Sequence, residues 1–64
     1  MTNTTNEILT NTISLERGQV KRKFVTPMES ISHIQGYCHA LRDFGFITVE
    51  ESVEIVSNYV QEVC

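Results

Sequence analysis

Three residues in the middle of the chain have side chains that bind metals or act as nucleophiles: His33, Cys38 and His39. A structural zinc site needs about four such ligands that converge on one point. On a helix, which turns by about 100° per residue, His33 and Cys38 point about 140° apart and His33 and His39 about 120° apart. One helix cannot chelate an ion with them, and a metal site would need a ligand from elsewhere, such as Cys64. We therefore expect no metal and no cofactor.

Catalysis by a cysteine needs a thiolate with a base beside it. Cys38 lies in an apolar pattern, where burial raises the pKa of a thiol, and His39 is turned about 100° away from it. Glu50 and Glu54 are one helical turn apart, but on a face that we expect to be solvated, where nothing tunes a carboxyl pKa. The sequence also lacks a glycine-rich phosphate loop. We expect no catalytic residue and no enzymatic activity.

The positive charges are concentrated in one short tract. Four of the five cations, Arg17, Lys21, Arg22 and Lys23, precede Phe24, whereas six acids and one arginine follow it. Cations beside an aromatic residue can follow a nucleic-acid backbone and stack a base. The formal net charge of −3 argues against this as the main role, so nucleic acid is a possible partner that we do not favour over protein.

Two helices are strongly predicted in the second half of the chain. Thr26-Pro27-Met28-Glu29 and Thr48-Val49-Glu50-Glu51 both have the pattern of a capping box, in which a threonine and a glutamate satisfy the first free amides of a helix. Gly45 supplies a residue that readily ends a helix. The pattern predicts helices over 27–44 and 49–63, packed antiparallel because the connection is short.

The first 25 residues allow two interpretations. Residues 1–11 are mostly Thr and Asn, which resist regular helix, and we expect a flexible arm there. Residues 12–25 alternate apolar and polar on both sides of Gly18, which favours a β-hairpin. The preferred fold is therefore α+β: an N-terminal β-hairpin and an αα-hairpin in one small domain over 12–64. In the alternative, a helix from near Thr5 to Gly18 gives an all-α fold with three helices.

The second predicted helix has an apolar arc of about 180°, wider than one neighbouring helix covers. Self-association is the simplest way to bury it, and we expect a homo-oligomer. Its interface residues would be Val49, Val53, Val56, Tyr59, Val60 and Val63. The candidate contacts with other partners are the exposed glutamates and the basic tract: Glu50, Glu51, Glu54, Arg17, Lys21, Arg22 and Lys23.

The 64 residues allow one domain, and no run of about 18 apolar residues predicts a membrane span. The sequence does not begin with a basic segment followed by an apolar one, which is the pattern that predicts a signal peptide. We expect no membrane partner and a cytoplasmic location.

The stretch from Ala40 to Glu51, ALRDFGFITVEE, resembles short C-terminal helical-hairpin (SHOCT-like) domains. In those domains a helix ends at glycine, passes through a hydrophobic-Ile-Thr segment and restarts with paired glutamates. The resemblance implies a small oligomerisation or interaction module without catalytic residues. In its length and polar start, the chain is also similar to the small accessory proteins of bacteriophages, many of which bind one host protein.

Together these observations favour a non-enzymatic protein-binding module. We expect an inhibitor or adaptor of phage type that acts on a host protein, in the host cytoplasm, as an oligomer. The first alternative is a small nucleic-acid-binding regulator that uses the basic hairpin. The second is an oligomer that sequesters a small molecule.

Overall fold

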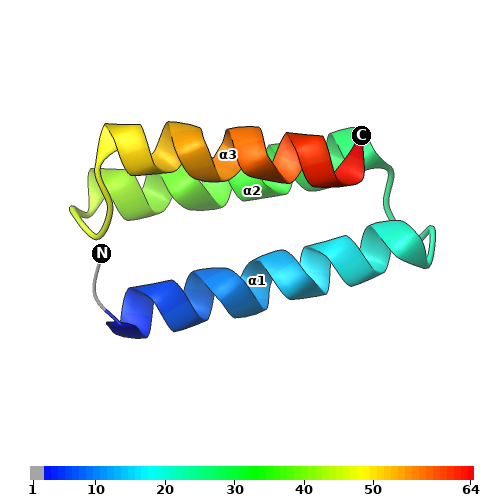
Figure 1. The fold of residues 1–64 in the computed structure, drawn as a ribbon, viewed down its shortest axis with the longest axis horizontal. Helices are drawn as coiled ribbons and strands as arrows, with labels where there is room; N and C mark the ends of the chain where they lie inside the picture. The colour runs from blue at the N-terminus through cyan, green and yellow to red at the C-terminus, as the bar shows by residue number, and fades with distance from the viewer. Residues whose placement is uncertain (1–2) are drawn as a thin grey trace.

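The computed structural model describes residues 3–64, which form three helices. They are α1 (Asn3–Lys21), α2 (Pro27–Asp43) and α3 (Val49–Val63). Each helix runs antiparallel to the one before it (Figure 1), so the start of α1 lies at the same end as the α2–α3 turn. Helix α3 packs chiefly on α2, and α1 contacts α3 least. None of the helices within residues 3–64 is long and apolar enough to cross a membrane.

The predicted β-hairpin over residues 12–25 is wrong, and so is the α+β fold class. Residues 3–64 contain no strand, and residues 12–21 are the second half of α1. Thr5, Leu9 and Ile13 recur every four residues, and the first two are buried while Ile13 packs against the core. This helical spacing outweighs the alternation around Gly18, because only the helix buries Leu9 and Ile13 together. The fold is the all-α alternative with three helices.

The expected flexible arm is also corrected. Residues 3–11 form the first half of α1, and residues 1 and 2 lie outside the described part of the chain. The Thr and Asn residues of this segment have low helix propensity. Packing of Leu9 against α2 and α3 supplies the stability that local preference does not.

Both predicted capping boxes are confirmed. The backbone N–H of Glu51 donates to Thr48 Oγ1 at 3.0 Å, and the N–H of Thr48 donates to the Glu51 carboxylate at 2.8 Å. Thr26 and Glu29 form the same reciprocal pair at the start of α2. Local sequence therefore fixes where α2 and α3 begin.

Helix α2 ends at Asp43, one residue before the expected end. Gly45 has a φ of +79°, and the N–H of Phe46 donates to the carbonyl of Leu41 at 2.8 Å, while that of Gly45 donates to Arg42. These are the two bonds of a Schellman ending, as glycine at this position predicts.

The end of α1 repeats this geometry with a lysine in the place of the glycine. Lys23 has a φ of +64°, its N–H donates to Val20, and the N–H of Phe24 donates to Gln19. A residue with a Cβ has a cost of about 1–2 kcal/mol in this left-handed conformation. The turn between α1 and α2 is therefore strained at Lys23.

We expect Lys23→Gly to raise the free energy of unfolding by about 1 kcal/mol, because glycine adopts the left-handed conformation without that cost. Urea denaturation followed by circular dichroism measures the change. Lys21→Gly is the matched control: Lys21 is helical, so the same exchange of side chain should lower stability there. A loss of stability in both variants would contradict strain at Lys23.

The core lies where the three helices meet. Its buried apolar residues come from every helix and from the α2–α3 turn: Leu9, Ile34, Cys38, Ile47 and Tyr59. A shell of half-buried side chains surrounds them, comprising Ile13, Ile31, Tyr37, Leu41, Ile55, Val56 and Val63. In so small a core, each of these side chains carries a large share of the buried area.

Candidate functional site

The candidate metal ligands do not come together. Cys38 is fully buried in the core, whereas His33 and His39 are exposed. Within residues 3–64, no three His, Cys, Asp or Glu side chains lie close enough to one another to hold a metal ion. Burial raises the pKa of the Cys38 thiol, which keeps it in the weakly nucleophilic neutral form at pH 7.

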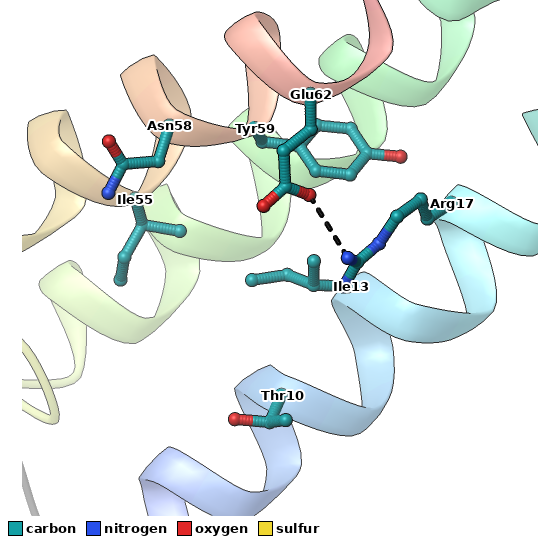
Figure 2. Close-up of a pocket in the computed structure, with 7 residues that line it drawn as sticks. All are labelled: Thr10, Ile13, Arg17, Ile55, Asn58, Tyr59 and Glu62. Carbon is teal, nitrogen blue, oxygen red and sulfur yellow. Dashed lines mark ion pairs between the residues drawn. The ribbon is translucent and has the colours of Figure 1, made fainter.

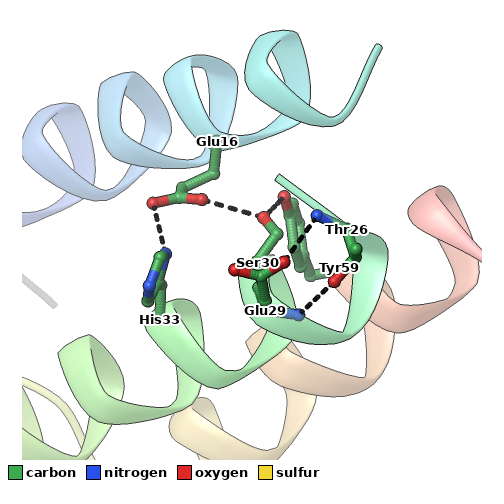
Figure 3. A network of polar contacts seen from close by, with 6 residues as sticks. All are labelled: Glu16, Thr26, Glu29, Ser30, His33 and Tyr59. Atoms are coloured by element: carbon green, nitrogen blue, oxygen red, sulfur yellow. Dashed lines mark hydrogen bonds and ion pairs between the residues drawn. The ribbon is translucent and has the colours of Figure 1, made fainter. Parts of the chain in front are cut away.

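A network of polar side chains that the sequence analysis missed connects all three helices (Figure 3). Ser30 Oγ on α2 donates to Glu16 Oε2 on α1 at 2.9 Å, and it also bonds to the hydroxyl of Tyr59 on α3. Because serine has one hydroxyl hydrogen, the Tyr59 hydroxyl donates the second bond. The other Glu16 oxygen, Oε1, lies 3.3 Å from His33 Nδ1.

The network joins the three helices, and its serine and tyrosine, Ser30 and Tyr59, lie buried inside the bundle. The base beside the serine is the Glu16 carboxylate, and His33 contacts Glu16 and not the serine. One signal in the sequence points to Ser30: it lies four and eight residues before Ile34 and Cys38, on the core side of α2. Glu16 has a similar signal, because it lies three and seven residues after Ile13 and Leu9, on the core side of α1.

The four cations of the basic tract lie on the second half of α1 and in the residues just after it, and not on the predicted hairpin. Arg17 pairs with Glu62 on α3 at 3.4 Å (Figure 2). Arg22 donates from Nε to the carbonyl of Gly18 and lies over the Phe24 ring, 5.9 Å from its centre. Two of the cations are thus engaged within the chain, and Lys21 and Lys23 are exposed.

Arg17 and Glu62 close one end of a shallow groove of about 260 Å³ between α1 and α3. Figure 2 shows Ile13 and Ile55 on opposite walls, with Tyr59 behind them. This exposed ion pair joins α1 to α3, the pair of helices with the least contact.

The predicted acidic residues have different roles. Glu51 belongs to the capping box, and the bond from the backbone N–H of Thr48 lowers the pKa of its carboxyl group. Glu50 and Glu54 lie exposed on α3. Of the three, Glu50 and Glu54 are thus the carboxylates that remain candidates for an intermolecular contact.

The six predicted interface residues of α3 differ in how far they are buried within the single chain. Tyr59 is buried within the chain, and Val56 and Val63 pack against the core. Val60 is half-buried, whereas Val49 and Val53 are 58% and 61% exposed. We call Val49, Val53, Val56 and Val60 the valine stripe, because they lie within about 60° of one another around the helix. Its N-terminal half faces solvent.

Two more exposed apolar side chains lie beside the start of this stripe. Phe44 and Phe46, which we call the aromatic turn, connect α2 to α3 and are 79% and 54% exposed. Ile8 of α1 shares a groove of about 310 Å³ with Phe46, Tyr37 and Leu41. Exposed apolar side chains that gather at one end of a small protein are typical of a protein-interaction surface.

Comparisons with protein-family models, with curated proteins and with solved structures gave no match to this chain. The resemblance to helical-hairpin domains over Ala40 to Glu51 therefore stays an expectation.

Proposed function

We propose that this chain is a non-enzymatic protein-binding module that works as a homo-oligomer and acts as an inhibitor or adaptor of another protein. The observation that carries the proposal is the exposure of Phe44, Phe46, Val49 and Val53 at one end of the α2–α3 hairpin. Burying such side chains against a protein releases roughly 25 cal/mol for each Å² of apolar surface. Aromatic residues such as Phe44 and Phe46 are enriched at the buried centre of protein interfaces.

The proposal assigns the two halves of this surface to different partners. The valine stripe binds a second copy of the chain, and the aromatic turn contacts the other protein. A helix surface that is regular along its length suits a symmetric contact. A protruding pair of phenylalanines suits insertion into a pocket of a different protein.

A second candidate function is supported by the end of α1. Phe24 is 74% exposed, and Arg22 lies over its ring while Lys21 and Lys23 are exposed nearby. A cation cluster with an exposed aromatic ring can bind single-stranded nucleic acid by stacking. We rank this reading second because Arg17 pairs with Glu62 and the chain has a net charge of −3.

Sedimentation equilibrium of the full chain tests the oligomer, with a reducing agent present to prevent disulfides through the exposed Cys64. We expect a mass that rises with concentration from the 7.3 kDa of one chain. Labelled single-stranded and double-stranded DNA at two salt concentrations test the second candidate. Tight, salt-sensitive binding by a chain that keeps the mass of a monomer would overturn our ranking.

A further inference from the structure

The valine stripe has edges of opposite charge. On one side, a groove between α2 and α3 brings His39 and Arg42 of α2 beside Val53 and Val56. On the other side, Glu50 and Glu54 follow Val49 and Val53 by one residue, which places them about 100° around α3. The apolar stripe thus has a basic edge formed by α2 and an acidic edge formed by α3.

The two charged edges lie at the same height along the molecule. Arg42 is in the last turn of α2, and Glu50 is in the first turn of the antiparallel α3. Arg42 lines the same groove as Val53, the residue before Glu54. A second copy that presents the same surface can therefore bring an arginine level with these glutamates.

Resting on the proposed function, we infer that the valine stripe binds the valine stripe of a second copy in a two-fold dimer whose two α3 helices are parallel. A two-fold axis along α3 places the basic edge of each copy against the acidic edge of the other, and thereby forms two sets of Arg42–Glu50 and Arg42–Glu54 contacts. An axis perpendicular to α3 makes the helices antiparallel, and it places basic edge against basic edge and acidic edge against acidic edge. Opposite charges across an interface select the first arrangement and disfavour the second.

Arg42 is able to make the additional contact. Its Nη2 atom lies 3.6 Å from Asp43 Oδ1 of the same chain, and its side chain is 34% exposed. A guanidinium group has five N–H donors, so the pair with Asp43 leaves donors for a carboxylate of the second copy. Parallel α3 helices also place Val49 next to Val49 and Val53 next to Val53 across the axis.

Disulfide trapping distinguishes the two orientations. The variants V49C/C64S and V60C/C64S each carry one exposed or half-exposed thiol in addition to the buried Cys38. A disulfide needs Cα atoms about 4.4–6.8 Å apart. In the parallel dimer, V49C/C64S alone oxidises to a cross-linked dimer. When V49C/C64S and V60C/C64S are mixed, we expect no disulfide between the introduced thiol of one variant and that of the other above the level of the C64S control.

Reversal of charge provides a second measurement that does not depend on thiols. We expect R42E to weaken the dimer about tenfold and the triple variant R42E/E50R/E54R to restore it to within about twofold, because the triple variant reverses all three of the charges that face one another. Circular dichroism checks that each variant is folded. A mixed V49C–V60C product, or a dimer of normal mass without V49C cross-links, would overturn the parallel orientation but leave the module oligomeric. A mass of one chain at every concentration would overturn both proposals.

Discussion

Replacing Tyr59 with alanine is expected to lower the free energy of unfolding by about 3–5 kcal/mol. Tyr59 is 2% exposed and is the largest side chain in the core. Its ring packs among residues of all three helices, and its hydroxyl donates to Ser30. Alanine removes the ring and leaves Ser30 without the bond that Tyr59 donates to it.

This expected loss is a large share of the total stability of the fold. Removing a large buried aromatic side chain costs about 3–5 kcal/mol. A domain of this length has a total stability of roughly 3–10 kcal/mol, at about 0.05–0.15 kcal/mol per residue. Urea denaturation at low protein concentration, followed by circular dichroism at 222 nm, measures the loss without a contribution from self-association.

Tyr59→Phe is the matched control, since it keeps the ring and removes only the hydroxyl. We expect it to cost about 1 kcal/mol, the usual net value of one hydrogen bond, with the helices intact. If Tyr59→Phe lowered the free energy of unfolding as much as Tyr59→Ala, the polar network and not the ring would hold the bundle together.

The double variant V49S/V53S is expected to abolish self-association and leave the fold intact. Both side chains are more than half exposed in the single chain, so serine removes little that the fold needs. In the dimer each valine contributes about 1 kcal/mol of apolar burial, and each copy provides two. The total of about 4 kcal/mol corresponds to roughly a thousandfold increase in Kd.

V56S separates the interface from the core within the same stripe. Val56 packs against the core, so its replacement lowers the free energy of unfolding as well as any affinity. Sedimentation and urea denaturation of the two variants together give the comparison. A V49S/V53S protein that is folded and still dimeric would exclude the valine stripe as the interface.

Local signals were sufficient for the second half of the fold and insufficient for the first. Thr26-Glu29 and Thr48-Glu51 determine where α2 and α3 begin through bonds within four residues. Helix α1 is rich in Thr and Asn, which disfavour helix. It forms because Leu9 and Ile13 reach a core built by residues more than twenty positions away, information that a local pattern does not contain.

The sequence predicted part of the candidate site: the apolar face of α3, but not the contacts between helices. The periodicity of α3 identified the valine stripe, but it also placed Tyr59 at an interface, because the pattern does not tell which part of a wide apolar arc its own chain covers. Pairing of Arg17 with Glu62, and of Ser30 with Glu16, joins residues from different helices. Such contacts depend on how the helices are arranged, and no spacing within one helix reveals them.

The two cysteines differ in a way that makes the chain easy to label. Cys64 is exposed, Cys38 is fully buried, and the C-terminus lies at the opposite end of the bundle from the aromatic turn (Figure 1). A thiol-reactive dye or surface linker therefore attaches to the native protein at a single position. It leaves the phenylalanines of the far end accessible to whatever protein is offered to them.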